Sequence, residues 1–210
     1  MRALRSVTKN SFVSGLIFGA IFSLIVNVIT VQIQEIIKKQ RILEAIEMEI
    51  ASNIIQGDKT IAINRKVIDS GDVPNYFRTI TFYSRDLWEQ SSDPLQYIAQ
   101  LDPTVQNDIH DYYTVTLKQN NQLLNRVERL ANEKLLNCDP SVGQAIDKER
   151  QIECTKWNKA ILEIENLSAL NVGEKGIEVL KKFHPTKDRL NNIFLRILMG
   201  DKSTRFLSGS

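Results

Sequence analysis

The chain has 210 residues, of which 25% are charged, 42% are hydrophobic and 7% are aromatic. Its 27 basic and 25 acidic residues are interspersed and leave a net charge of only +2, which argues against nucleic acid as a partner. The composition also argues against low complexity and disorder, and the roughly 175 residues after the N-terminal region suffice for one domain with its own core.

Residues 11 to 33, SFVSGLIFGAIFSLIVNVITVQI, contain no charged side chain and follow a basic tail over residues 1–10. As a helix, about 23 residues cover the ~30 Å hydrocarbon core of a bilayer. A cleavable signal peptide would have a shorter apolar centre and a small-x-small cleavage site, where this chain has VITVQIQEIIKK. A buried core helix would not need the basic residues that flank the run on both sides. We therefore expect a transmembrane helix over 11–33, with the lipid bilayer as a partner.

Small or polar residues recur at every fourth position of this run. Gly15, Gly19, Ser23 and Asn27 follow Ser11 at this spacing and share one face of the helix. Such a face lets a second helix approach closely, although small residues are also common in spanning helices that do not associate. We predict a helix–helix interaction site here, for self-association or for a protein partner. Asn27 is singled out because an unpaired amide in the bilayer costs free energy.

The orientation of the predicted span is not decided by charge counts. Three basic residues lie near each end of the span: Arg2, Arg5 and Lys9 before it, and Lys38, Lys39 and Arg41 after it. A short charged tail is hard to translocate, whereas a long domain crosses largely regardless of its charge. We expect a single-pass membrane protein with its N-terminus in the cytoplasm and its domain outside.

Residues 34–200 are predicted to form an all-α domain, a helical bundle entered directly from the transmembrane helix. Apolar residues at spacings of three, four and seven predict an amphipathic helix that continues the span and ends at Gly57. A second short helix is expected from Asp58 to Gly71, with a strand as the alternative. Residues 76–90 also fit either a helix or a strand, and the helix is favoured because little else in the chain alternates.

The clearest predicted soluble helix begins after its cap at Asp102 and is stopped at Pro140. A further helix carries Trp157, and GIEVLKKF forms a short helix that ends before Pro185. A last amphipathic helix is expected from Thr186 up to Gly200, and residues 201–210 are expected to be flexible. Burial of its apolar face in the same bundle is favoured over a membrane surface or a partner groove.

Cys138 and Cys154 admit two interpretations. They can form a disulfide in an oxidising compartment, closing a loop of about 16 residues, or they can be two small buried apolar residues. A helix starting at Ser141 would place Cys154 about 20 Å from that start, which is too far for a bridge. A helix starting near Asp147 would allow the preceding loop to fold back. Both interpretations stay open, and a disulfide would support the outside location.

No sequence pattern here is typical of catalysis or of metal binding. His110 and His184 are the two histidines, without H-x-x-x-H or C-x-x-C spacing, and no phosphate-binding or nucleophile-elbow motif occurs. The neighbours of His110 in DIHD lie one or two residues away and do not converge on one point of a helix. We expect no enzyme and no cofactor; an enzyme would require a cleft in which a histidine meets a carboxylate from another helix.

One stretch carries a family resemblance. LEAIEMEIASNII is followed by FRTITFYSRDLWEQ and by a long helix with paired tyrosines. This layout, over residues 11 to about 135, resembles uncharacterised prokaryotic single-pass membrane proteins with a helical soluble domain. The resemblance rests on the E-I-x-x-N stretch from Glu49 to Asn53. It implies the anchor and the helical domain, and it assigns no functional residue.

These observations predict a non-enzymatic single-pass membrane protein whose helical domain mediates protein–protein interaction, as an accessory subunit or assembly factor of a membrane complex. The alternative is a membrane-anchored domain that senses a ligand. A pocket lined by Trp88, Tyr112 or Trp157 would favour that alternative.

Overall fold

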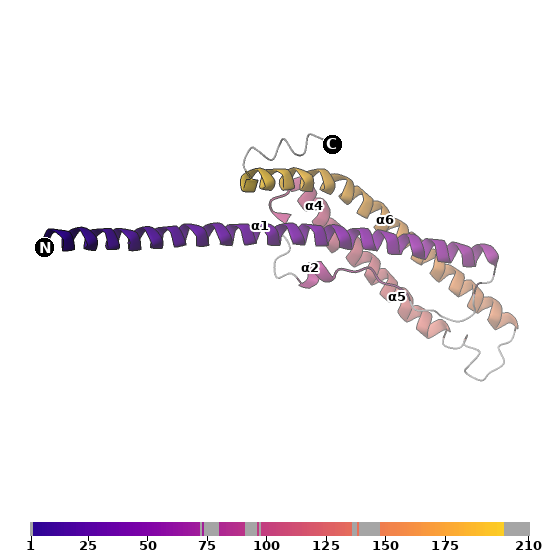
Figure 1. Cartoon of the computed structure of the whole chain (residues 1–210). Coiled ribbons are helices and arrows are strands. Elements are labelled where there is room, and N and C mark those ends of the chain that lie inside the picture. The colour runs from indigo at the N-terminus through magenta and orange to yellow at the C-terminus, as the bar shows by residue number, and fades with distance from the viewer. Residues whose placement is uncertain are drawn as a thin grey trace. The chain divides into compact units, whose positions relative to one another are not determined.

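The computed structural model describes residues 2–71, 73, 80–90, 96, 98–135, 138 and 148–199 (Figure 1). Its elements are α1 (Arg2–Ser70), α2 (Asp86–Gln90), α4 (Pro103–Asp111), the π-helix η1 (Tyr112–Leu117), α5 (Lys118–Leu135) and α6 (Lys148–Met199). No strand occurs in this described part, which confirms the all-α prediction. The chain divides into two compact units, Met1–Ile42 and Leu43–Ser210.

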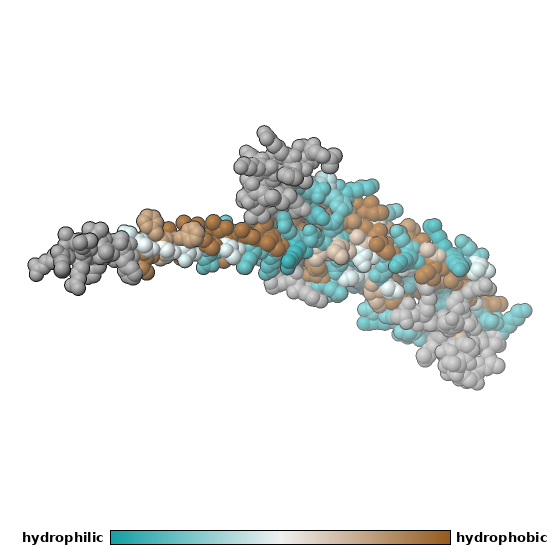
Figure 2. Space-filling model, viewed as in Figure 1, coloured by the Kyte–Doolittle hydropathy of each residue, from teal (hydrophilic) through white to brown (hydrophobic). Residues whose placement is uncertain are grey.

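The first unit consists of the N-terminal part of α1. Residues 14–31 are all exposed, and they form a continuous apolar band along the helix (Figure 2). Within the described residues, α1 is the one helix long and apolar enough to cross a membrane, judged by length and composition. The prediction of one long apolar helix near the N-terminus is therefore confirmed at the level of secondary structure.

In the second unit α1 does not end at Gly57, and no separate helix begins at Asp58. The helix continues to Ser70 and is followed by Gly71 with φ of 74°, the left-handed conformation that commonly terminates helices. A Cβ atom on Gly57 would lie 3.2 Å from the carbonyl oxygen of Ala169 in α6. The prediction was wrong because this glycine permits a close helix–helix approach, and a sequence alone does not distinguish that role from a helix end.

Helices α1 and α6 pack against each other in opposite directions. A Cβ atom on Gly176 of α6 would lie 2.9 Å from Cγ1 of Ile54 in α1. Further along α1, the Asn64 side chain donates to the Leu162 carbonyl at 3.3 Å and to the Glu165 carboxylate at 3.1 Å. Rising residue numbers in α1 thus pair with falling numbers in α6, which makes the contact antiparallel.

The region predicted as a helix over residues 76–90 is helical only in α2. Residues 80–85 are described without helical structure, and residues 74–79 lie outside the described part of the chain. Ile80 and Tyr83 are buried, so this stretch contributes to the core although it is not a helix. Hydrogen bonds from α1 and α5, described below, replace those that a helix would have formed.

The predicted helix after Asp102 is present, but it contains a π-helical turn. The Asp102 side chain accepts a hydrogen bond of 2.9 Å from the backbone of Thr104, and Pro103 occupies the first helical position. The chain continues as α4, then as η1, then as α5, and both α4 and η1 pack against α6. The predicted stop at Pro140 lies outside the described residues.

Helix α6 passes through Pro185 without interruption, so the prediction of two helices separated at this proline was wrong. Proline removes one backbone hydrogen bond, and the residues on both sides of it are held by α1, since His184 and Lys187 both contact Glu47. The Thr186 hydroxyl donates to the Lys182 carbonyl at 3.0 Å, and Phe183 is buried in the core. The side chains after residue 188 lie outside the described part, as do Gly200 and the tail 201–210 that was predicted to be flexible.

Candidate functional site

The predicted interaction face on the apolar part of α1 is exposed in the structure. Gly15, Gly19, Ser23 and Asn27 are all open to the surroundings, and a Cβ atom added to either glycine would meet nothing within 4 Å. The Thr30 hydroxyl has a hydrogen-bond partner in its own helix, since it donates to the Val26 carbonyl at 2.8 Å. The Asn27 amide forms no hydrogen bond within the described residues. Association with a second helix through this face stays a prediction.

The E-I-x-x-N stretch has a structural explanation in the second unit. Glu49 and Asn53 are four residues apart and therefore lie on one face of α1. The Asn53 Nδ2 group donates to the Ser84 carbonyl at 2.9 Å, and the Ser84 backbone N–H donates to Asn53 Oδ1 at 2.9 Å. A side-chain amide has one N–H donor and one carbonyl acceptor side by side, as the backbone of a neighbouring strand does. Asn53 therefore pairs with the backbone of residues 80–85 in the way that a strand would.

A second asparagine repeats this pairing from α5. The Tyr83 backbone N–H donates to Asn121 Oδ1 at 3.0 Å, and Asn121 Nδ2 donates to the Tyr83 carbonyl at 2.8 Å. In addition, Gln56 of α1 donates to the Phe82 carbonyl at 2.8 Å. Three side-chain amides on two helices therefore bind the backbone of residues 80–85. These bonds satisfy backbone N–H and carbonyl groups of a stretch that has no helical hydrogen bonds of its own.

The Glu49 carboxylate accepts hydrogen bonds from three groups of the same region. Its donors are the Ser84 hydroxyl at 2.6 Å, the Leu87 backbone N–H at 3.2 Å and the Tyr113 hydroxyl at 2.8 Å. Burial, together with the Glu49 charge, raises the pKa of Tyr113. The Tyr113 ring stacks on Trp88 with centroids 4.8 Å apart. These three hydrogen bonds use three of the about four acceptor sites of the carboxylate, and the bond from Leu87 positions α2.

The two histidines differ in their contacts. His110 lies beside its neighbour Asp111, with Nδ1 3.5 Å from the carboxylate. His184 of α6 contacts Glu47 of α1 at 2.9 Å, which is a cross-helix pair of the kind that an enzyme would require. The other Glu47 oxygen binds Lys187, so this carboxylate joins the two helices. Among the described residues, no group of three or more ligating side chains could hold a metal ion.

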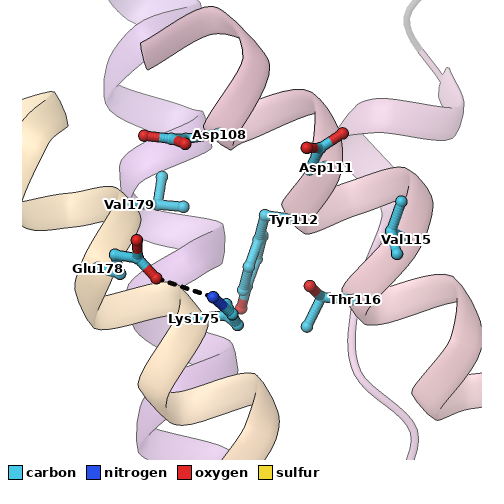
Figure 3. Close-up of a pocket in the computed structure, with 8 residues that line it drawn as sticks. All are labelled: Asp108, Asp111, Tyr112, Val115, Thr116, Lys175, Glu178 and Val179. Carbon is cyan, nitrogen blue, oxygen red and sulfur yellow. Dashed lines mark hydrogen bonds and ion pairs between the residues drawn. The ribbon is translucent and has the colours of Figure 1, made fainter. Parts of the chain in front are cut away.

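A cavity of about 250 Å³ lies between α4, η1 and α6 (Figure 3). It is lined by Asp108, Asp111, Tyr112, Val115, Thr116, Lys175, Glu178 and Val179. Of the three aromatic residues considered for a ligand pocket, Tyr112 lines this cavity. Trp88 instead stacks on Tyr113, and Trp157 is a partly exposed residue of α6 that does not line this cavity.

Two lysines balance part of the negative charge around the cavity. Lys175 contacts Glu178 at 2.9 Å, and Lys182 contacts Asp108 at 2.7 Å and Glu178 at 3.6 Å. The hydrogen bond from Lys175 lowers the pKa of Glu178, and the hydrogen bond to Asp108 raises the pKa of Lys182. These groups therefore stay charged across the physiological pH range.

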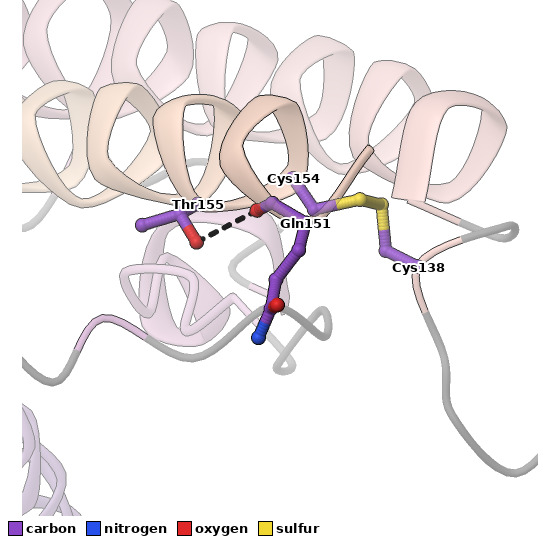
Figure 4. The surroundings of a disulfide bond; sticks show 4 residues. All are labelled: Cys138, Gln151, Cys154 and Thr155. Atoms are coloured by element: carbon purple, nitrogen blue, oxygen red, sulfur yellow. Dashed lines mark hydrogen bonds between the residues drawn. A yellow bond between two sulfur atoms is a disulfide. The ribbon is translucent and has the colours of Figure 1, made fainter. Parts of the chain in front are cut away.

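Cys138 and Cys154 form a disulfide with Cα atoms 5.9 Å apart (Figure 4). Helix α6 begins at Lys148, close to the later of the two helix starts considered from the sequence. With the helix beginning there, the Cα separation of the two cysteines is within the range of a disulfide. Both cysteines are also buried, so the bridge adds a covalent link to a packed contact beside α6.

Sequence reasoning missed the two asparagines that pair with residues 80–85, although one of them, Asn53, belongs to the quoted E-I-x-x-N stretch. The available signal was an amide on an otherwise apolar helix face, which must find a partner when buried. Comparison with protein-family models, with curated proteins and with solved structures finds no match for this chain.

Proposed function

We propose that this chain is a single-pass membrane protein, with its helical domain outside the cytoplasm, that takes part in protein–protein interaction through its span as an accessory subunit or assembly factor of a membrane complex. The observation that carries the proposal concerns Asn27. Its side-chain amide forms no hydrogen bond within the described residues, and it lies on an apolar helix segment whose side chains are exposed. Such a group in a bilayer calls for a polar partner on another helix.

The membrane part of the proposal rests on the exposed apolar side chains of α1. They are Leu16, Ile17, Phe18, Ile21, Phe22, Leu24, Ile25, Val26, Val28, Ile29 and Val31. Removing each such side chain from water is worth about 1.5–3 kcal/mol, or about 17–33 kcal/mol for the set of eleven. A typical domain is stable by only about 5–15 kcal/mol, so the hydrophobic gain of covering this segment exceeds the stability of a whole domain. A bilayer provides that cover.

The proposed orientation rests on two independent features. The short N-terminal tail is basic, and such a tail is retained in the cytoplasm while a long domain is translocated. The disulfide between Cys138 and Cys154 belongs to the second unit, and disulfides persist in oxidising compartments outside the cytoplasm. Both features support a domain located outside.

The interaction part of the proposal rests on a contrast within the span. The Thr30 hydroxyl bonds to its own helix, whereas the Asn27 amide forms no hydrogen bond within the described residues. Gly15 and Gly19 lie on the same face as Asn27 and present no side chain to an approaching helix. A partner helix on this face would gain close packing and an interhelical hydrogen bond of about 0.5–2 kcal/mol.

The test is site-specific cross-linking in native membranes, with the full chain carrying a photoreactive residue in place of Ser23. The chain should form a discrete adduct with a second copy or with another membrane protein. Replacing Asn27 with Leu, or Gly19 with Ile, should weaken that adduct several-fold.

The matched control is Ser14→Ile, which enlarges a small residue of the same helix away from the stripe. It should leave the adduct unchanged. A span that gives no adduct, or an adduct equally strong in all variants, would remove the interaction proposal.

A further inference from the structure

The cavity between α4, η1 and α6 lies entirely in the second unit and involves no residue of the predicted span. Three of its lining residues, Tyr112, Val115 and Thr116, come from the π-helix. A π-helical turn costs stability relative to a regular α-helix and is frequent at functional sites. An irregular turn and a cavity at the same place together suggest a ligand site.

One end of the cavity is acidic. Asp108 and Asp111 both lie at the upper end in Figure 3, on opposite sides of it. Asp108 is paired with Lys182 at 2.7 Å, whereas Asp111, whose side chain is 70% exposed, lies 3.5 Å from the His110 ring. Asp111 therefore keeps most of its capacity to bind a cationic group.

The opposite end carries hydrogen-bond donors. The Lys175 ammonium, the Thr116 hydroxyl and the hydroxyl end of Tyr112 lie together at the lower end in Figure 3. Lys175 uses one of its three N–H groups on Glu178, so it retains donors for a second acceptor. An oxyanion suits the Lys175 and Thr116 donors.

The Tyr112 hydroxyl is a buried polar group that the protein does not satisfy. The residue is 1% exposed, and its oxygen has no hydrogen bond of normal geometry. The nearby Asn53 amide donates to and accepts from the Ser84 backbone and keeps a second N–H group. Burial raises the pKa of Tyr112, so the hydroxyl keeps its proton and acts as a donor. Buried groups of this kind usually have a partner, which can be a ligand or a water.

We propose that this cavity binds a small zwitterion of the amino acid class. Its ammonium group contacts Asp111, and its carboxylate contacts Lys175 and Thr116. Asp111 and Thr116 are five residues apart, or about 7 Å along a helix, so the two charges are better separated by several bonds than by one carbon. This favours an ω-amino acid or a dipeptide, with Val115 and Val179 beside its chain.

The experiment compares four probes by titration calorimetry with the full chain in detergent. The zwitterions are 4-aminobutyrate and glycylglycine, and the matched single charges are butylamine and butyrate. At least one zwitterion should bind at millimolar concentration, about tenfold more tightly than either single charge. Equal binding of butylamine would replace the proposal by a simple cation site. No binding of either zwitterion would overturn it.

Variants locate the binding. Asp111→Asn and Lys175→Gln should each weaken binding of the zwitterion by at least about tenfold. Asp111→Asn alone should also abolish any residual binding of butylamine. The matched control Lys181→Gln removes an exposed charge from the same helix outside the cavity and should leave the affinity unchanged. Binding that survives both cavity variants would contradict the proposed site. The interaction proposed above rests on other residues, so either proposal can fail without the other.

Discussion

The side chain of Asn53 and the backbone of Ser84 form two reciprocal hydrogen bonds of 2.9 Å each, although the residues are 31 positions apart in the sequence. Asn53 is fully buried, at 0% exposure. Its amide therefore provides hydrogen-bond partners for both the N–H and the carbonyl of Ser84, which would otherwise need water. This pair fixes the stretch 80–85 against α1 and thereby positions α2.

Asn53→Ala should destabilise the domain by about 1–3 kcal/mol, because it leaves the Ser84 N–H and carbonyl buried without partners. Asn53→Asp should also destabilise it, because the acceptor is kept but the donor is lost. Urea unfolding of the full chain in mild detergent, followed by tryptophan fluorescence, measures both effects. Ser52→Ala alters an exposed neighbour on the same helix and should change stability by less than about 0.5 kcal/mol. A midpoint unchanged in Asn53→Ala would refute this role.

Two glycines of α6 should respond to alanine in opposite directions. A Cβ atom on Gly173 would meet nothing within 4 Å, so Gly173→Ala should stabilise the helix by about 0.5–1 kcal/mol. On Gly176 the Cβ atom would lie 2.9 Å from Ile54 and 3.3 Å from the Tyr112 hydroxyl. Overpacking there should cost about 1–3 kcal/mol, more than the gain in helix propensity. Thermal melting of the two variants compares them, and a shift of the same sign in both would contradict the described packing of α1 on α6.

Reduction should weaken the domain through the bridge between Cys138 and Cys154, which are 16 residues apart. Opening a loop of this length should lower the unfolding free energy by about 3 kcal/mol. Urea midpoints with and without a reductant measure the change. A Cys138→Ser/Cys154→Ser double variant serves as the control and should not respond to the reductant. Two alkylatable thiols in protein that was never reduced would show that the bridge does not form.

Stability should fall in alkaline solution because of Tyr83. Burial raises the pKa of this tyrosine from 10.0 to about 12. Since the folded-state pKa is higher than the unfolded one, the contribution to stability is complete below pH 10 and is lost as the pH rises through about 12. Unfolding free energies at intervals between these pH values should decline for the natural chain and decline less for Tyr83→Phe. Equal slopes in the two proteins would contradict the assignment.

Local sequence patterns predicted the helices but not all of their ends. Asp102 followed by Pro103 predicted a helix start correctly, because capping depends on neighbours in the sequence. Gly57 and Pro185 were interpreted as helix breaks, yet both lie inside helices. Each is accommodated by tertiary contacts, at Ala169 for the glycine and on both sides of the proline, and such contacts are not encoded in local periodicity.

The candidate sites were predictable to different extents. The stripe that contains Asn27 could be read from spacing alone, because four-residue intervals define one helix face. The cavity could not be read in this way, since Tyr112 and Lys175 come from elements far apart in the sequence and only the packing of η1 on α6 brings them together. The same is true of Asn121, whose partner Tyr83 is 38 residues away.

The location of the domain is the central claim, and cysteine labelling in intact cells tests it most directly. Leu167 of α6 is 66% exposed, so Leu167→Cys places a reactive thiol on the surface of the second unit. The unchanged chain, whose own cysteines are buried and bridged, serves as the control. A membrane-impermeant maleimide should label the variant before lysis if the domain lies outside the cytoplasm. Labelling that requires lysis would place the domain in the cytoplasm and contradict the account.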